Sequence, residues 1–245
     1  MAQGFDIKGK RVLVTGASSG IGREIATHCA RAGASVVITG RNEDRLAETL
    51  SSLEGSGHSL FAGDLIEASA RDALIASLPE LDGVVHSAGV NVLRPFKFLD
   101  QKNLEAVTRV NLDAPMLLTS ALLKKKKILS GGSILFIASI SGLIGAAGYT
   151  AYAASKGALV AGTRVMALEL APQRIRVNCI SPGIVRTPLL DSMAESADFS
   201  EKEKLHPLGF GSVEDVAHAV HYLLSPAAQW VTGSNLIIDG GYTAH

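Results

Sequence analysis

Two residues four positions apart, Tyr152 and Lys156, have the types and the spacing for acid–base chemistry. They lie in an Ala-rich segment of helical character, and on a helix residues i and i+4 share one face. The ammonium group then faces the same point as the phenol, and we expect it to lower the phenol pKa from about 10 toward the working range. Such a phenol can give a proton to an oxygen atom or, in reverse, take one from a hydroxyl.

Two more polar residues stand where they could join this pair. Ser139 ends an apolar run thirteen residues before Tyr152, and its hydroxyl could polarise a substrate oxygen. Asn111 lies between apolar neighbours inside a segment, 101–127, that we interpret as one long helix. A buried amide there is costly unless it has a hydrogen-bond partner. Because Tyr-x-x-x-Lys spacing is common, an exposed helical pair remains the alternative on these residues alone.

A glycine-rich turn follows the first apolar run and leads into a helical segment. The turn consists of Gly16, Ala17, Ser18, Ser19, Gly20, Ile21 and Gly22. Glycines let a pyrophosphate approach the backbone N–H groups at a helix N-terminus, and the two serines add hydroxyl donors. No Gly-Lys-Ser/Thr follows, so the turn is not a P-loop. The pattern indicates a dinucleotide site, with an unliganded tight turn as the alternative.

The elements that must position these residues alternate along the chain. Short, β-branched apolar runs occupy residues 11–15, 35–39, 59–62, 83–86, 133–139, 175–180 and 235–238. Helical segments occupy residues 21–32, 42–53, 67–78, 101–127, 152–170 and 213–224. Continuous apolar strands between helices are typical of a parallel sheet that is buried on both faces. We therefore predict a doubly wound α/β fold, and the absence of a linker favours a single domain over residues 1–245.

Composition excludes several classes of protein. The 23 Lys and Arg balance the 23 Asp and Glu, which argues against a nucleic-acid binder. The two cysteines cannot build a disulfide framework, which fits a reducing compartment. No apolar run reaches the roughly 18 residues that span a bilayer, and the first ten residues are polar. We expect a soluble cytoplasmic protein without a membrane partner.

The turn, with Thr15 before it, has the spacing Thr-Gly-x-x-x-Gly-x-Gly, which resembles the short-chain dehydrogenase/reductase family. The order and spacing of Asn111, Ser139, Tyr152 and Lys156 resemble this family's catalytic tetrad, so the resemblance covers essentially the whole chain. It implies a Rossmann-like fold with a seven-stranded parallel sheet in the order 3-2-1-4-5-6-7 and helices on both faces. It also implies that Tyr152 protonates a carbonyl oxygen as hydride arrives, that Lys156 holds the nicotinamide ribose, and that Asn111 supports a water for proton return.

The end of the second predicted strand bears on the choice of cofactor. An acidic residue there would bind the adenosine 2′-hydroxyl of NAD, whereas an arginine accommodates the 2′-phosphate of NADP. Arg41 and Asn42 follow this strand, and no acidic residue occupies the turn. Guanidinium pairs bidentately with phosphate, so we predict a preference for NADP(H). Use of NAD(H), with Arg41 facing water, is the alternative, as in an NAD-dependent polyol or sugar dehydrogenase.

The resemblance extends to further cofactor contacts. By this resemblance, Asp64 binds the adenine amino group, and the backbone of Ser87, Ala88 and Gly89 lines the adenosine site. The remaining residues that it implies are Leu65, Pro182, Gly183, Ile184 and Thr187. The segment His86-Ser87-Ala88-Gly89 replaces the family's usual Asn-Asn-Ala-Gly, so the side chains of His86 and Ser87 are not equated with those amides.

A substrate pocket is expected where the fourth and fifth strands end. Residues 184–210 interrupt the alternation and are interpreted as a lid, with a plain surface excursion as the alternative. The predicted lining is mainly apolar, and Arg94 and Arg186 are the candidate partners for a carboxylate. It comprises Val90, Asn91, Val92, Ser139, Ile140, Leu143, Tyr149, Leu189, Leu190 and Met193. The substrate is then a small carbonyl compound or alcohol, as in 3-oxoacyl-carrier-protein reductases or polyol and xylulose reductases, which the family resemblance leaves open.

Other assignments concern partners and rival roles. The family implies a homotetramer, with helices 101–127 and 152–170 at an interface that small residues would allow. Those small residues are Ala153, Ala154, Gly157, Ala158, Ala161 and Gly162. Lys124 to Lys127 are interpreted as a solvated helix end, with docking of an acyl carrier protein as the alternative. Asp215, His218 and His221 share a helix face but lack a metal-binding pattern, so we expect no metal. A catalytically silent dinucleotide-binding regulator is the rival class.

Overall fold

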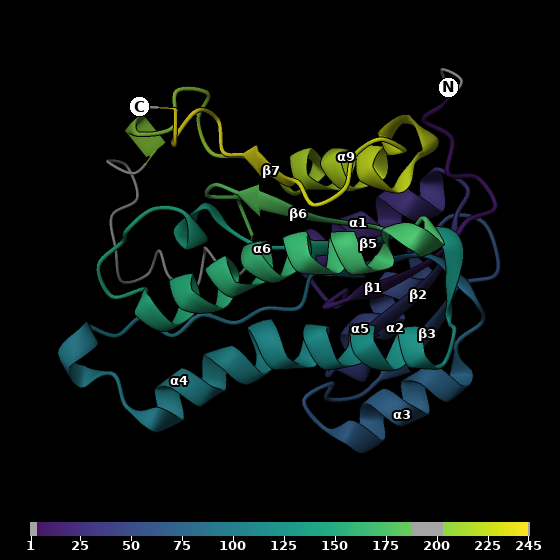
Figure 1. Ribbon diagram of the computed structural model, residues 1–245, viewed down its shortest axis with the longest axis horizontal. Coiled ribbons are helices and arrows are strands. Elements are labelled where there is room, and N and C mark those ends of the chain that lie inside the picture. The colour runs from purple at the N-terminus through teal and green to yellow at the C-terminus, as the bar shows by residue number, and fades with distance from the viewer. Residues whose placement is uncertain (1–3, 188–202, 245) are drawn as a thin grey trace.

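The computed structural model describes residues 4–187 and 203–244 and contains one seven-stranded sheet (Figure 1). Its strands are β1 (Arg11–Thr15), β2 (Ser35–Gly40), β3 (Ser59–Ala62), β4 (Leu81–His86), β5 (Ile128–Ile137), β6 (Arg176–Pro182) and β7 (Asn235–Ile238). All neighbouring pairs are parallel, in the order β3-β2-β1-β4-β5-β6-β7, which confirms the predicted fold. The strand order reverses between β1 and β4, and the carboxyl ends of strands at such a switch point border a ligand crevice.

Helices cover both faces of the sheet. They are α1 (Gly20–Arg31), α2 (Glu43–Ser51), α3 (Ala68–Ser77), α4 (Gln101–Thr108), α5 (Ala114–Lys124), α6 (Thr150–Leu170) and α9 (Val213–Leu224). One layer consists of α1, α2 and α9, and its buried residues join one core cluster. The other layer includes α3, α5 and α6, which pack on the opposite face (Figure 1).

Strand β1 shows why its sequence is apolar without interruption. Val12 and Val14 belong to the core under α1 and α9, while Leu13 belongs to the core under α5 and α6. All three are fully buried, so side chains on both faces of the strand contribute. Burying each of them stabilises the fold by about 1.5–3 kcal/mol relative to exposure. The central strands are therefore a rigid support for the loops at their ends.

Two predicted elements differ from the structure. The single helix predicted over residues 101–127 is interrupted by a π-helical turn, η2 (Arg109–Asp113), because Asn111 bonds to a neighbouring loop there. Strand β5 begins at Ile128 and ends at Ile137, rather than spanning residues 133–139. Ser139 instead caps a 3-10 turn, η3 (Ile140–Gly142), which leads the chain away from the sheet.

Only the ends of the predicted lid belong to the described residues. Val185 forms a parallel bridge with Gly211, so the segment leaves and returns at one place beside β6. Three of its predicted substrate residues, Leu189, Leu190 and Met193, lie outside the described residues. Within the parts that are described, no helix is long and apolar enough to cross a membrane.

Candidate active site

The glycine turn between β1 and α1 leaves no room for side chains. Gly16 has a φ of +69°, and a Cβ added there would lie 2.6 Å from the Cα of Ala88. A Cβ added at Gly22 would lie 2.3 Å from the carbonyl oxygen of Gly16. Such distances are far below normal contact, so glycine is required by the packing of the turn against itself and against the end of β4. The backbone is thereby brought close to any ligand above the turn.

Hydrogen bonds hold this turn to the end of β4. The Thr15 hydroxyl oxygen accepts from the backbone N–H groups of Ser87 at 3.2 Å and Ala88 at 3.3 Å. Helix α1 begins after Ser19, which makes no side-chain capping bond to the described residues, and the first turn of α1 contains no acidic residue. Free N–H groups and the positive end of the helix dipole favour an anion there.

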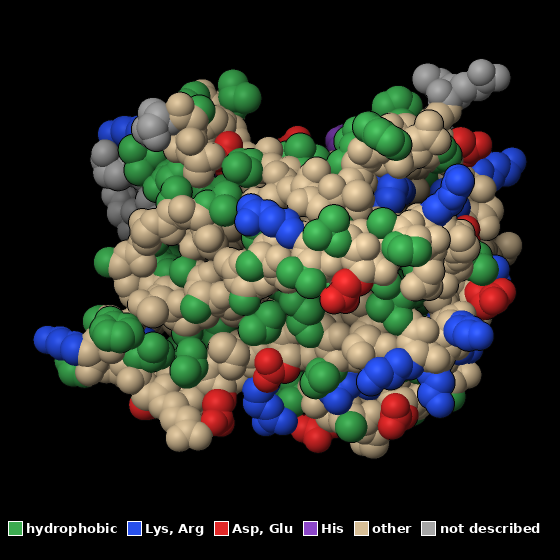
Figure 2. Space-filling model, in the orientation of Figure 1, with side chains coloured by type: hydrophobic (Ala, Val, Ile, Leu, Met, Phe, Trp, Pro, Cys, Tyr) green, Lys and Arg blue, Asp and Glu red, His purple; other side chains and the backbone are tan. Residues whose placement is uncertain are grey.

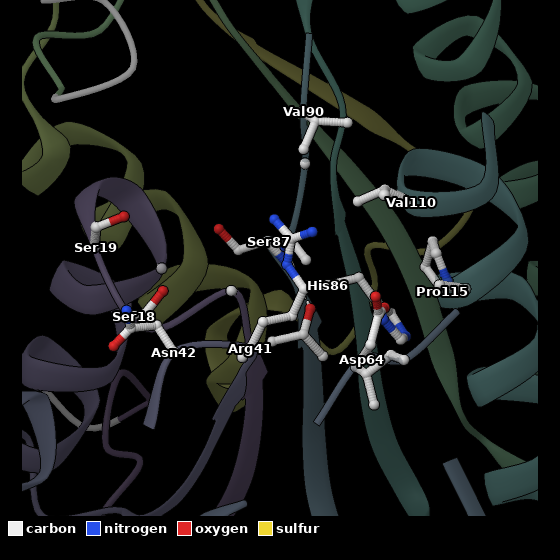
Figure 3. A pocket seen from close by; sticks show the side chains of 18 of the residues that line it. Ser18, Ser19, Arg41, Asn42, Asp64, His86, Ser87, Val90, Val110 and Pro115 are labelled. Atoms are coloured by element: carbon white, nitrogen blue, oxygen red, sulfur yellow. Dashed lines mark hydrogen bonds between the residues drawn. The ribbon is translucent and has the colours of Figure 1, made fainter. Parts of the chain in front are cut away.

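A cavity of about 710 Å³ extends from this turn across the ends of β1, β2, β3 and β4 (Figure 3). The side chain of Arg41 points into it, and Asp64 stands in its wall (Figure 3). Predicted cofactor residues that line it are Gly16, Ser18, Ser19, Gly20, Ile21, Gly22, Arg41, Asn42, Asp64, Leu65, Ser87, Ala88, Gly89 and Thr187. Its length, its tight glycine floor and its basic side chain fit a dinucleotide.

Several residues that line this cavity were not predicted from the sequence. Arg45, in the first turn of α2, is a second basic residue in the lining, and its backbone N–H donates to the capping side chain of Asn42 at 2.9 Å. Other lining residues come from η2 and α5, namely Val110, Ala114, Pro115 and Leu118. The four-residue spacing of Arg41 and Arg45 could have indicated that Arg45 lines the cavity. The other lining residues reach the cavity only through the packing of α5.

His86 replaces an amide of the family pattern and has a defined structural role. Its Nε2 lies 2.8 Å from the Thr119 hydroxyl oxygen, and that hydroxyl donates to the Pro115 carbonyl at 2.8 Å. Because the hydroxyl proton is used, His86 Nε2 must be the donor to Thr119. The ring also stacks on Phe136, with centroids 4.9 Å apart. Burial lowers the pKa of His86 to about 3, so the ring is neutral.

Lys156 lies at the junction of the cofactor cavity and the end of β5. It is buried, and its Nζ donates to the Ile137 carbonyl at 2.7 Å. A Cβ added at Gly89 would lie 3.5 Å from both Lys156 Nζ and Asn111 Oδ1, so these two groups converge beneath the β4 loop. Burial lowers the pKa of Lys156 to about 8, an effect that the nearby Cys179 thiol opposes.

Asn111 connects the helical layer to the β4 loop. Its Oδ1 accepts from the Val90 N–H at 2.8 Å, and its Nδ2 donates to the Val90 carbonyl at 2.9 Å. Nδ2 also donates to the Ser155 hydroxyl, one residue before Lys156. The buried amide therefore has partners, and the π-helical turn around it presents the side chain to the loop. Asn111 fixes the loop against the helix that carries Lys156.

Tyr152 and Ser139 meet at the other side of Lys156. The Ser139 hydroxyl hydrogen bonds with the Tyr152 phenol, and Lys156 Nζ lies 5.7 Å from the centre of the Tyr152 ring. Burial raises the pKa of Tyr152, and the bond to Ser139 lowers it by less. The expectation that Lys156 lowers this pKa is therefore wrong for the structure as described, because burial dominates and the ammonium is engaged by Ile137.

A second cavity, of about 260 Å³, surrounds this cluster. It shares Ile21, Ser87, Gly89 and Thr187 with the dinucleotide cavity, so the two meet. Predicted site residues that line it include Asn91, Ser139, Ile140, Tyr149, Tyr152, Lys156, Pro182, Gly183, Ile184 and Thr187. A Cβ added at Gly183 would lie 2.9 Å from the Cα of Asp239, so the wall after β6 is closely packed against the C-terminal segment.

Some predicted pocket residues lie elsewhere. Leu143 is 44% exposed and is not among the residues lining this cavity, because η3 turns it outward. Val90 lines the dinucleotide cavity, and Val92 lines neither of the two. The residues that the sequence did not indicate are Ile137, Ala138, Ser141, Ile144, Ala146, Val185 and Tyr242. Tyr242 comes from the chain's C-terminal segment, a placement that no local pattern could predict.

The histidines of α9 take part in helix packing. His28 Nε2 of α1 lies 2.9 Å from His221 Nδ1, and His221 Nε2 lies 2.6 Å from the Phe5 carbonyl. His218 packs edge-on against His28, whereas Asp215 accepts from the backbone of Ser212 in the cap of α9. Among the described residues, no group of three or more His, Cys, Asp or Glu could hold a metal ion.

Fold and comparisons together define a nicotinamide-dependent oxidoreductase. A family model described as enoyl-(acyl carrier protein) reductase matches residues 16–243. The chain is 34% identical to a cyclopentanol dehydrogenase from Comamonas sp. over 248 residues, covering 98% of this chain and 99% of that protein. An NAD-dependent glycerol dehydrogenase from Listeria innocua is 34% identical, with 98% and 96% covered. A 3-oxoacyl-[acyl-carrier-protein] reductase from Aquifex aeolicus is 35% identical, with 96% and 98% covered.

Solved structures agree with these matches. A crystal structure of a short-chain type dehydrogenase/reductase from Mycobacterium marinum superposes with a TM-score of 0.88 at 33% identity, covering 98% of both chains. The chain therefore belongs to the short-chain dehydrogenase/reductase family, whose members are oxidoreductases that act on CH–OH groups.

Proposed function

We propose that residues 1–245 form one catalytic domain that interconverts a ketone or aldehyde and an alcohol with NADP(H). The observation that carries this proposal is the meeting of Tyr152, Ser139 and Lys156 where a small cavity joins the dinucleotide cavity. Bound cofactor supplies or accepts the hydride at the substrate carbon. In reduction, the carbonyl carbon takes the hydride and its oxygen takes the Tyr152 proton, which gives the alcohol and the oxidised cofactor.

The protein's side chains divide the remaining work. The raised pKa keeps the Tyr152 phenol protonated and ready to donate, while the Ser139 hydroxyl orients it and can also bond to the substrate oxygen. Lys156 holds the nicotinamide ribose and returns a proton to Tyr152. Asn111 holds the loop beside Lys156 through Val90 and supports the route of that proton to solvent.

Arg41 supports the preference for NADP(H) over NAD(H). It follows β2 and points into the dinucleotide cavity (Figure 3), whose lining also includes Arg45, so the cavity offers two basic residues to a 2′-phosphate. Glu43 and Asp44 occupy the first turn of α2, and their charges oppose a phosphate at that site. An NAD-dependent polyol dehydrogenase is accordingly the second candidate, and the Listeria relative bears that name.

We infer a cytoplasmic homotetramer. The two cysteines are free and buried, which fits a reducing compartment. Exposed apolar side chains lie on the face formed by α4, α5 and α6 (Figure 2), namely Leu104, Leu117, Val165 and Leu168. Gly157 and Gly162 also lie close to groups of the same chain, since a Cβ added at Gly157 would lie 3.3 Å from the Gly142 carbonyl oxygen and one added at Gly162 would lie 2.7 Å from the Met116 Cε. Light scattering tests the assembly.

Docking of an acyl carrier protein is a lesser proposal. The relative from Aquifex aeolicus acts on such a partner by its name. In the lysine run, Lys127 donates to the Leu78 carbonyl, which leaves Lys124 to Lys126 to meet an acidic surface.

Steady-state assays of NADPH and NADH oxidation with a panel of ketones and aldehydes test the proposed function. We expect turnover with a higher kcat/KM for NADPH. Turnover with a clear preference for NADH would support the second candidate. Tight NADPH binding without oxidation of any cofactor would instead support the silent regulator.

A further inference from the structure

Arg23, in the first turn of α1, joins the glycine turn to the start of α2. Its Nη2 donates to the Ser18 carbonyl at 2.9 Å and to the Glu48 carboxylate at 3.2 Å. The Arg45 carbonyl oxygen lies 3.4 Å from the same nitrogen. One guanidinium nitrogen therefore links the turn between β1 and α1 to the helix whose N-terminus follows Arg41.

The two segments that Arg23 joins form one part of the dinucleotide cavity. Ser18 lines this cavity together with Arg41 and Asn42 (Figure 3). A Cβ added at Gly40 would lie 3.5 Å from the Ser18 hydroxyl oxygen, so the turn lies close to the end of β2. The described lining of neither cavity includes Arg23. Arg23 can therefore act on a bound dinucleotide only through the residues that it holds.

Stability alone is a weak reason for this arrangement. Arg23 Nε is buried and makes no hydrogen bond to the described residues, which costs free energy. The side chain of Glu48 is 66% exposed, and an ion pair with such an exposed partner contributes little to stability. The contact of Nη2 with the Ser18 carbonyl is shorter than its contacts with Glu48 and Arg45. These observations favour a role for Arg23 in fixing the position of the glycine turn relative to α2.

We propose that Arg23 is a positioning residue for cofactor selectivity, because it fixes the distance between the glycine turn and the segment from Arg41 to Arg45. One ribose separates the pyrophosphate of a dinucleotide from the 2′ position of its adenosine, so the span between these groups is nearly constant. Both groups are bound well only when the two protein segments are held at the matching distance. Without Arg23, contacts at the 2′ position weaken more than contacts at the pyrophosphate.

This inference rests on the proposed function for the kind of cofactor, a nicotinamide dinucleotide, but not for the preference between NADP(H) and NAD(H). Fluorescence titration of NADPH and NADH into wild type, Arg23→Met and Arg23→Lys gives the ratio of the two Kd values. We expect Arg23→Met to reduce this ratio by about tenfold, mainly through weaker binding of the preferred cofactor. Arg23→Lys should keep most of the ratio, because an ammonium group can also donate to the Ser18 carbonyl.

Arg31→Met is the matched control. Arg31 lies at the other end of α1 and pairs with Glu54, which follows α2. It does not line the described walls of either cavity, so both Kd values should stay at the wild-type level. The Arg23 side chain is 38% exposed, so we expect the Arg23 variants to fold with melting temperatures close to that of wild type.

The same titrations separate this inference from the proposed function. The preference of wild type tests the proposed cofactor, and oxidation of that cofactor by ketones tests the proposed reaction. A Kd ratio that falls in Arg23→Met would uphold the positioning role even if NADH is preferred or no ketone is reduced. An equal change in both Kd values, no change in either, or equal Kd values in wild type would overturn it. A ratio that falls as far in Arg23→Lys as in Arg23→Met would overturn it as well.

Discussion

The two cavities, which share Ile21, Ser87, Gly89 and Thr187, are built in different ways. The dinucleotide cavity is shaped largely by backbone, since Gly16 and Gly22 sit where even a Cβ would collide with main-chain atoms. The catalytic cavity is shaped by side chains from η3, α6, the loop after β6 and the C-terminal segment. Gly145, between the lining residues Ile144 and Ala146, has no described group within 4 Å of an added Cβ, whereas Gly183 after β6 is packed closely against Asp239. Backbone geometry therefore maintains cofactor binding, while side chains are free to set the substrate.

The largest expected effect is on cofactor affinity, when a methyl group is added to the glycine turn of the dinucleotide cavity. Gly22→Ala places a Cβ 2.3 Å from the Gly16 carbonyl oxygen, so the turn must move away from the phosphate position. We expect NADPH affinity to fall by about a thousandfold, or about 4 kcal/mol, in fluorescence titration. Gly145→Ala is the matched control and should leave this affinity unchanged, because no group of the described residues lies within 4 Å of its added Cβ. An equal loss of NADPH affinity in the two variants would contradict the difference between the dinucleotide cavity and the catalytic cavity.

A smaller expected effect is the contribution of His86, which lines the dinucleotide cavity, to the pH dependence of stability. Its pKa of about 3 in the folded protein lies below the value of about 6.5 for an exposed histidine. The unfolded chain therefore binds more protons between these values, and stability falls as the pH drops below about 6.5. This group should account for about 2 kcal/mol of the stability lost between pH 7 and pH 5.

Urea denaturation of wild type and His86→Gln at both pH values measures that contribution. The variant should lose less stability on acidification than wild type does. Some acid sensitivity should remain, because burial beside His221 and His218 also lowers the pKa of His28 to about 4. An identical loss of stability in the two proteins would show that His86 is not held neutral by burial.

The smallest expected effect is that of Arg41, which lines the dinucleotide cavity, on the KM for NADPH. Arg41→Ala should raise the KM for NADPH by about tenfold and leave that for NADH unchanged, since one charge-assisted contact to a phosphate is lost. Arg31→Ala is the control, because Arg31 pairs with Glu54 and does not line the cavity. An equal change for both cofactors would indicate that Arg41 shapes the loop and does not select the phosphate.

The same contrast explains what the sequence could predict. Strand order and the glycine turn follow from local periodicity and from the resemblance, because buried parallel strands and backbone-lined turns leave strong patterns. The π-helical turn was missed because it depends on bonds between Asn111 and Val90, which are 21 residues apart. Tyr242 was missed because only tertiary packing brings it to the catalytic cavity. The direction of the Tyr152 pKa shift was not predicted because burial, which spacing does not reveal, raises this pKa by more than the hydrogen bond with Ser139 lowers it.

The most direct test of the account is the Tyr152→Phe variant, with turnover and cofactor binding measured on the same preparation. Loss of the phenol removes the proton donor but leaves the glycine turn, Arg41 and Lys156 in place. We predict that kcat for ketone reduction falls by about a thousandfold, while the Kd for NADPH stays within about threefold of wild type. Turnover that persists at about the wild-type rate would contradict the assignment of Tyr152 as the acid.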